Sequence, residues 1–138
     1  MSWQPPRIIF PDVELLICGL LRDALAGRAE PYAAGVYVGT TVPNPRLPRM
    51  ITVRHDGGAR IDAALETAQL GINVYASTET DVNDLARLTR ALLWAAPNGK
   101  PLTRVDDVSG PVAVPNESGQ FLRYLTVEAT LRGEPLSA

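Results

Sequence analysis

The stretch VRHDGGARID, residues 53–62, contains the residue types of this chain that are most able to do chemistry. It holds the only histidine, His55, next to Asp56, and the pair Gly57–Gly58 follows. A histidine and a carboxylate can act together as a general base and its orienting partner. Adjacent side chains on a strand point to opposite faces, however, so His55 and Asp56 cannot meet there. No G-x-S-x-G nucleophile motif occurs, so the stretch predicts a turn and no catalytic residue.

A metal or phosphate site finds equally little support. The residues that could hold a metal lack a spaced histidine or cysteine partner: His55, Asp56, Asp62, Asp106 and Asp107. Gly57–Gly58 is not followed by a helix start or by a Lys-Ser/Thr pair, as a phosphate loop would be. Cys18 is the only cysteine, which excludes an internal disulfide, and its place within an expected helix indicates packing. The sequence therefore predicts no cofactor and no metal; a small hydrolase or metal enzyme using His55 is kept as the alternative.

The composition is that of one globular domain. Of the 138 residues, 46% are hydrophobic and 20% are charged, which predicts a single domain over residues 1–138. A net charge of −2 and a pI near 5.3 disfavour a specific nucleic-acid-binding protein. The apolar runs are too short to span a membrane, and the N-terminus does not read as a secretory signal, so we expect a cytoplasmic protein. Lys100 is the only lysine, and arginine is the cation that suits subunit interfaces, although a GC-rich genome explains the bias equally well.

Two segments have the apolar spacing of amphipathic helices: residues 11–27 and 78–95. Asp12 and Thr78 are their expected N-caps, because the side-chain oxygen of either residue can accept a hydrogen bond from a free backbone amide. We expect Gly27 to end the first helix in the left-handed conformation. Gly19 lies within that helix and indicates a place where another backbone packs closely.

Six segments predict strands: residues 36–38, 50–55, 64–76, 103–108, the proline-bounded edge segment 111–115, and 124–132. Alternating apolar and polar residues in the longest of them indicate a sheet that is covered on one face only. Three prolines exclude helix and central strand from residues 41–49 and predict an extended arm. The Asp-Gly-Gly sequence predicts a mobile hairpin loop over residues 56–63. We therefore expect an α+β fold, a mostly antiparallel sheet with two helices packed on one face, and a structured core over residues 11–133.

The uncovered sheet face is polar but carries little charge. Its expected residues on the two long strands are Gln69, Asn73, Tyr75, Tyr124, Thr126 and Thr130. A solvated surface explains this composition. A subunit or tube-facing surface explains it as well, because interfaces are depleted in charge and enriched in tyrosine. A ring of identical subunits needs two different patches on each chain, and the proline-rich arm and the glycine hairpin are the candidates for these patches.

Three phrases of the chain resemble a known family: PRMITVRHDGG, AQLGINVYASTETDVNDLARLTRALL and VSGPVAVPNESGQFLRYLTVEATLRG. Together with the order of elements, they are similar to the tail terminator (tail completion) proteins of long-tailed phages of actinobacteria. The resemblance extends from about Pro11 to Gly133. A head–tail neck completion or stopper protein is the alternative within the same class.

The resemblance implies a structural protein of the virion, assembled in the host cytoplasm. Such proteins form a hexameric ring on the head-proximal end of the tail tube, end its polymerisation and present a surface to the neck or connector protein of the head. The implied partners are further copies of the chain, the major tail tube protein and that connector; DNA passes through the lumen, and no membrane is involved. In the family, loops of the free subunit become ordered on assembly, which implies this behaviour for residues 56–62 and ion-pair roles for Arg54 and Arg60. The expected oligomer or tube interface consists of Arg54, Asp56, Gly57, Gly58, Arg60, Tyr75 and Tyr124.

Overall fold

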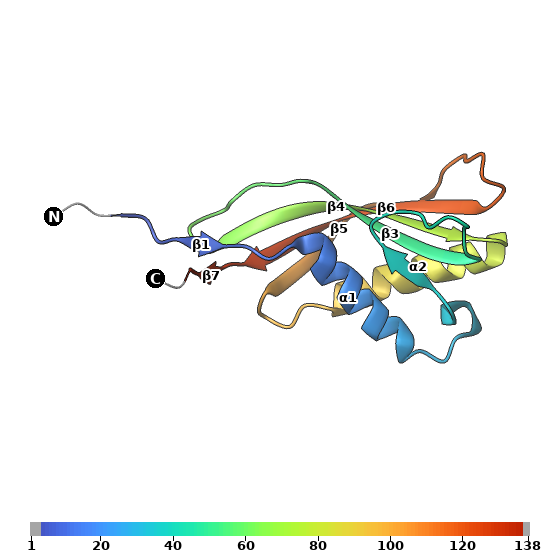
Figure 1. Ribbon diagram of the computed structural model, residues 1–138, viewed down its shortest axis with the longest axis horizontal. Helices are drawn as coiled ribbons and strands as arrows, with labels where there is room; N and C mark the ends of the chain where they lie inside the picture. The colour runs from blue at the N-terminus through green and yellow to red at the C-terminus, as the bar shows by residue number, and fades with distance from the viewer. Residues whose placement is uncertain (1–3, 137–138) are drawn as a thin grey trace.

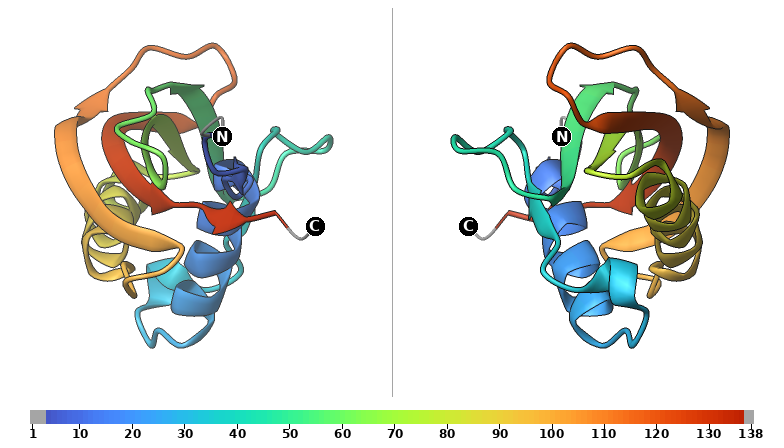
Figure 2. Two further views of the ribbon diagram at one scale, coloured as in Figure 1. Left: turned by 90° about the vertical axis from the view of Figure 1, so that its left-hand side faces the viewer. Right: turned by 90° about the vertical axis from the view of Figure 1, so that its right-hand side faces the viewer.

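The computed structural model describes residues 4–136 and has an α+β fold, as the sequence predicts (Figure 1). Its elements, in chain order, are β1 (Ile8–Ile9), α1 (Val13–Ala26), a 3-10 helix (Pro31–Ala33), β2 (Tyr37–Gly39), β3 (Arg49–Gly57), β4 (Leu65–Ala76), α2 (Glu79–Ala95), β5 (Leu102–Ala113), β6 (Phe121–Arg132) and β7 (Glu134–Pro135). Five strands form one sheet in the order β2-β3-β4-β6-β5, in which only β2 and β3 are parallel. Both helices cover the same face of this sheet (Figure 2). The expected fold class is confirmed.

The hydrophobic core lies between the helices and this inner face of the sheet. The alternation predicted for the two long strands is confirmed, since Leu70 and Ile72 of β4 and Leu125 and Val127 of β6 are almost completely buried. The apolar stripes of the helices supply the opposite layer: Val13, Ile17, Cys18, Leu21 and Leu25 from α1, and Val82, Leu85, Ala86, Thr89 and Leu93 from α2. No helix in residues 4–136 is long and apolar enough to cross a membrane.

Both helices begin at the expected caps. The side chain of Asp12 accepts a hydrogen bond from the Leu15 amide at 3.2 Å, and Thr78 Oγ1 accepts one from the Asp81 amide at 3.2 Å. Two details of the first helix differ from expectation. Gly27 follows it with φ −88° and ψ 0°, in the right-handed region. Gly19 has open space where a Cβ would stand, so no other backbone approaches it.

The edge strand β5 is one element where the sequence predicts two. It pairs with β6 along Leu102–Ala113, and its register shifts at three places. The last shift lies between Ser109 and Val112 and takes up Pro111, whose ring nitrogen has no hydrogen to donate to a neighbouring strand. Irregular pairing at a sheet edge thus joins the segments 103–108 and 111–115.

The two ends of the chain pair with each other in a small sheet that the sequence reading misses. Ile8 and Ile9 of β1 lie antiparallel to Pro135 and Glu134 of β7. The pair extends beyond the end of the main sheet (Figure 1). Strands of two residues have no measurable period, so no hydrophobic pattern announces them.

The connection between β3 and β4 folds back onto its own strands. The Asp62 carboxylate accepts hydrogen bonds from the amides of Ala64 and Leu65, and the Thr67 amide donates to the Ala59 carbonyl. Gly58 has φ +147°, and a Cβ there would stand 2.0 Å from the carbonyl oxygen of Thr67. Glycine is therefore required at this close approach. The mobility expected for residues 56–63 stays a prediction.

Candidate functional site

Three of the expected interface residues meet on the outer face of the sheet. Arg54 Nε donates to Asp56 Oδ1 at 2.5 Å, and its Nη2 lies 3.3 Å from Oδ2. A Cβ on Gly71 would stand 2.8 Å from both Asp56 Oδ2 and the Tyr124 hydroxyl oxygen, and 3.2 Å from Arg54 Nη2. The missing side chain of Gly71 thus makes the space in which side chains of β3 and β6 come together across β4. We call Arg54, Asp56 and Tyr124 the outer-face cluster.

The outer-face cluster is electrostatically matched within one chain. The hydrogen bond from Arg54, its charge and the Tyr124 hydroxyl lower the pKa of Asp56, against a smaller opposing effect of desolvation. The same pairing raises the pKa of Arg54. Arg54 and Asp56 therefore remain charged at neutral pH and neutralise each other. The resemblance implies an inter-subunit partner for Arg54, whereas in the single chain its partner is Asp56.

Tyr75 lies in a second place on the outer face, under the proline-rich arm. The guanidinium of Arg46 lies 5.0 Å from the centre of the Tyr75 ring, a cation–π arrangement. Arg46 also donates to Gln120 Oε1 at 2.8 Å, and Gln120 Nε2 donates to the Leu47 carbonyl at 2.8 Å. Met50, which pairs with Tyr75 across the strands, is fully buried although it is outside the main core. The arm therefore packs against its own sheet.

The expected interface residues of the hairpin, Gly57, Gly58 and Arg60, lie in a third place. The register of the strands shifts between His55 and Gly57, and Gly58 begins the connection to β4. The guanidinium of Arg60 lies 5.1 Å from the centre of the Phe10 ring, so it contacts the N-terminal segment. The seven expected interface residues thus divide into the outer-face cluster, Tyr75 under the arm, and the group Gly57, Gly58 and Arg60. Sequence reasoning missed Gly71, Arg46 and Gln120; the one signal available for Gly71 is a glycine within a strand, which indicates close backbone or side-chain approach.

Both the backbone amide and the side-chain ring of His55 make hydrogen bonds within the chain. Its backbone amide donates to Glu14 Oε2 of α1 at 2.9 Å, and its ring Nε2 lies 3.0 Å from the Gly57 carbonyl oxygen. Asp56, the neighbour that could orient it as a base, is bound to Arg54 instead. Among the described residues, the hydrogen-bond partner of the ring is therefore a backbone carbonyl and not a carboxylate.

Asp106 and Asp107, which were also considered as metal ligands, are each bound to an arginine. Asp106 binds Arg104 at 2.8 Å, and Asp107 binds Arg90 at 3.0 Å. Residues 4–136 contain no group of three or more His, Cys, Asp or Glu side chains placed to hold a metal. Cys18 is buried in the core, where desolvation raises the pKa of its thiol.

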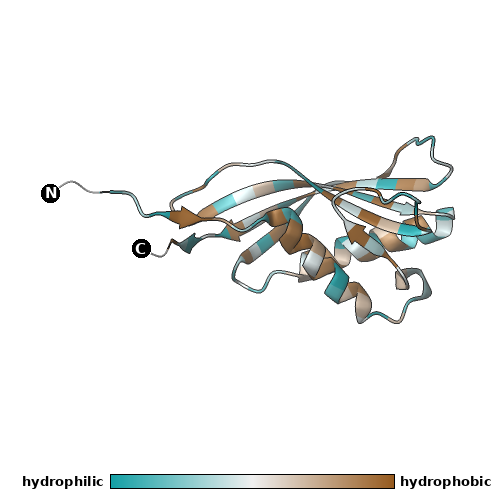
Figure 3. Cartoon of the chain, viewed as in Figure 1, coloured by the Kyte–Doolittle hydropathy of each residue, from teal (hydrophilic) through white to brown (hydrophobic). Residues whose placement is uncertain are grey.

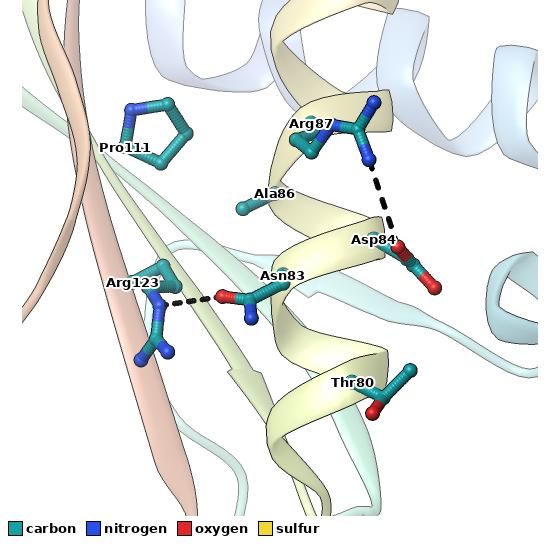
Figure 4. Close-up of a pocket in the computed structure, with 7 residues that line it drawn as sticks. All are labelled: Thr80, Asn83, Asp84, Ala86, Arg87, Pro111 and Arg123. Atoms are coloured by element: carbon teal, nitrogen blue, oxygen red, sulfur yellow. Dashed lines mark hydrogen bonds and ion pairs between the residues drawn. The ribbon is translucent and has the colours of Figure 1, made fainter.

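One open hollow lies between α2 and the strands β5 and β6 (Figure 4). Arg123 Nε donates to Asn83 Oδ1 at 2.9 Å on one side, and Arg87 lies 3.9 Å from Asp84 on the other. Thr80 contributes the only hydroxyl of its lining, and Asp84, the one carboxylate of the lining, is paired with Arg87. The hollow is open to solvent, and its lining lacks the constellation of an active site.

The comparisons with known proteins find similarity in fold and none in sequence. No family model and no curated protein matches the sequence. Among solved structures, the chain is similar to one from the "Virion of native gene transfer agent (GTA) particle", with a TM-score of 0.63 and 18% sequence identity. The superposition covers 82% of this chain and 92% of that chain. The two chains therefore share a fold over most of their lengths.

Proposed function

We propose that this protein is a structural, non-enzymatic component of a virion, a tail terminator of a long-tailed phage. The observation that carries the proposal is the fold, which matches 92% of a chain from a gene transfer agent virion. The resemblance of residues 11–133 to tail terminator proteins supports the finer assignment. Fold alone does not define function, so the surface chemistry must also fit. The outer face, with its mutually neutralised ion pair and two tyrosines, fits an assembly surface.

The proposed mechanism is capping by complementarity. Copies of the chain form a ring, expected to be a hexamer, on the head-proximal end of the tail tube. The ring mates with the last ring of tube protein, offers no tube-like surface for further growth and presents its other side to the connector. Ordering of the hairpin residues 56–63 in the ring costs conformational entropy, which keeps ring formation weak away from the tube. The lumen lets DNA pass without sequence-specific contacts.

The test is end-capping of tail tubes. Purified protein is added to growing tubes of the tube protein from the same virion, and the products are imaged by negative-stain electron microscopy. We expect a ring at one end of each tube and tubes of arrested length. Tubes that grow unchanged with bare ends would rule out the tail terminator function, and rings found only on the connector would establish the neck completion alternative.

The outer-face cluster is tested in the same assay with a matched pair of variants. Asp56→Arg places two cations side by side on the outer face, and Asp23→Arg makes the same change on an exposed position of α1. We expect Asp56→Arg to reduce the fraction of capped tubes at least tenfold and Asp23→Arg to leave it unchanged. Equal capping by both variants would remove the outer-face cluster from the interface.

A further inference from the structure

The connection between α2 and β5 is a turn of polar residues at the surface of the molecule (Figure 3). It contains Asn98 and Gly99, both exposed, and Asn98 is the one asparagine of the chain's five that precedes a glycine. The backbone amides of Asn98 and Gly99 each donate to the Leu102 carbonyl oxygen at 3.1 Å, and the Lys100 amide donates to Asn98 Oδ1 at 3.2 Å. The side chain of Asn98 is therefore folded against the backbone that follows it.

The hydrogen bond to Asn98 Oδ1 brings two reactive atoms together. It closes an Asx turn, a ring that contains the side-chain carbonyl carbon of Asn98 and the backbone nitrogen of Gly99. If that nitrogen attacks that carbon, negative charge develops on Oδ1, where the Lys100 amide already donates in the manner of an oxyanion hole. The turn therefore positions the Gly99 nitrogen as a nucleophile and stabilises the intermediate that its attack forms.

Gly99 leaves room for this attack. Outside its chain neighbours, no atom lies within 4 Å of the place where its Cβ would stand, and its φ of +91° is one that glycine adopts without strain. Its amide proton is held by the Leu102 carbonyl, an acceptor that it shares with the Asn98 amide. Hydrogen bonds of an exposed turn open at little cost in free energy, so the nitrogen is available in the folded chain.

We propose that Asn98 is a site of spontaneous deamidation, in which water is the co-reactant. The Gly99 nitrogen loses its proton to a base from the solvent and forms a bond to Asn98 Cγ. The bond from Cγ to the side-chain nitrogen breaks, and that nitrogen takes up a proton and leaves as ammonia. Water then opens the resulting succinimide ring at either of its carbonyl carbons and gives aspartate or isoaspartate at position 98. The net reaction consumes one water and releases one ammonia, and no atom is oxidised or reduced.

Three other asparagines lack this combination. The nitrogen after Asn44 belongs to Pro45 and carries no hydrogen. Asn73 lies within β4, which is paired on both sides, and Asn83 lies within α2, where its Oδ1 accepts a hydrogen bond from Arg123. Regular secondary structure thus engages the backbone that follows Asn73 and Asn83.

Asn116 provides an internal control. It is exposed, and its Oδ1 accepts a hydrogen bond from the Ser118 amide at 3.0 Å, the same Asx turn as that of Asn98. The residue that follows is Glu117, whose side chain crowds the backbone nitrogen that would have to attack. The two turns therefore compare a glycine with a larger residue at the attacking position.

Incubation of the folded protein at mildly alkaline pH, followed by trypsin digestion and mass spectrometry, tests the proposal. Trypsin places Asn98 in the peptide 91–104 and Asn116 in the peptide 105–123, because Pro101 protects the bond after Lys100 from cleavage. We expect the mass gain of deamidation to accumulate in the first peptide about tenfold or more faster than in the second. Isoaspartyl methyltransferase labels the isoaspartate product, and an unincubated sample corrects for deamidation during digestion.

Matched variants locate the reaction. Asn98→Gln moves the side-chain carbonyl carbon one bond further from the backbone and is expected to remove the modification, whereas Asn116→Gln is expected to leave it unchanged. Each reaction adds one negative charge to a chain of formal net charge −2, so the modified protein separates on isoelectric focusing. Asn98→Asp carries the same added charge and is expected to comigrate with the acidic species of the incubated wild type. Circular dichroism establishes that each variant is folded.

The same incubation in urea measures what the folded turn contributes. We expect the rate in the folded chain to lie within about tenfold of the rate in urea. A folded protein that stays unmodified while the unfolded chain reacts, equal rates for the two peptides, or an acidic species that forms in Asn98→Gln at the wild-type rate would each overturn the inference. The inference is independent of the proposed function, because it concerns the chemistry of one turn, and none of these results bears on the capping of tail tubes.

Discussion

An arginine and an aspartate two positions apart on a strand lie on the same face of the sheet. In this protein that spacing lets the two charges on the outer face form an ion pair with each other. Arg54 and Asp56 bind each other, and Gly71 on the neighbouring strand provides the room. The ion pair therefore forms before any partner arrives. What an approaching surface meets is a neutral pair with a tyrosine hydroxyl beside it.

The pH dependence of Asp56 follows from this pairing. Its pKa is lowered in the folded chain, chiefly by Arg54, so the pairing stabilises the fold at pH values above the unfolded pKa of about 4 and is lost as the pH falls through the lower folded pKa. Carbon-detected NMR titration of the Asp56 carboxyl group should show a midpoint below the ordinary range. Arg54→Gln should raise that midpoint, whereas Arg87→Gln, a change on α2, should not.

The two glycines of the hairpin should respond unequally to alanine. At Gly58 a Cβ meets the Thr67 backbone at 2.0 Å, whereas at Gly57 it meets nothing within 4 Å, although φ is positive at both. We expect Gly58→Ala to lower the free energy of unfolding by about 3 kcal/mol and Gly57→Ala by roughly 1 kcal/mol. Urea denaturation measures both, and equal losses would show that the connection relaxes away from Thr67.

At the scale of helices and strands, the sequence predicts the elements whose apolar residues recur with a regular spacing. Both helices and the long strands β4 and β6 follow from apolar spacing, and the caps Asp12 and Thr78 follow from their hydrogen-bonding groups. The pairing of β1 with β7 and the continuity of β5 depend on contacts between segments that are distant or irregular in the sequence. No local pattern encodes such contacts.

The candidate site could likewise be predicted only where a periodic pattern determines which face of the sheet a residue occupies. The outward-facing positions of Tyr75 and Tyr124 follow from strand alternation. The sequence could not predict that Arg46 lies over Tyr75 or that Arg60 lies over Phe10, because each contact needs a loop conformation that propensities do not specify. The expected interface residues therefore lie in three separate places of the folded chain, and their part in an interface stays a prediction.

Gly19 offers a stabilising substitution. Glycine within a helix loses more backbone entropy on folding than alanine does, and at this position a Cβ meets no atom within 4 Å. Gly19→Ala should raise the free energy of unfolding by about 0.5–1 kcal/mol and the midpoint of thermal unfolding by about 2–5 °C. Gly99→Ala is the control, because φ there is +91° and alanine should destabilise the protein. A loss of stability in Gly19→Ala would contradict the open surroundings of this residue.

The proline-rich arm should be released by one substitution outside it. Gln120 holds the arm through Arg46 and through the Leu47 carbonyl. In Gln120→Ala we expect limited trypsin digestion to cut after Arg46 several-fold faster, because an arm free of its sheet fits a protease more readily. Glu117→Ala, in the same turn, serves as the control. An unchanged rate would show that the arm is held by its prolines and by Tyr75 alone.

At the scale of the whole molecule, the two helices and the sheet share one core, so they should unfold together. Cys18 reports on this because its thiol is buried and its pKa is raised by desolvation, which makes it unreactive until α1 leaves the sheet. In urea, pulse labelling of Cys18 with a thiol reagent and far-UV circular dichroism should give one coincident transition. Labelling that precedes the loss of circular dichroism would show that α1 detaches first.

The hydrogen bond from the His55 amide to the Glu14 carboxylate has a consequence for solubility. It occupies a backbone donor on the part of β3 that extends past β2. An added β-strand from a foreign chain would have to displace a charged group there, which discourages the edge-to-edge growth that leads to fibrils. Copies of the chain can thus be concentrated with this stretch of sheet edge closed to strand addition.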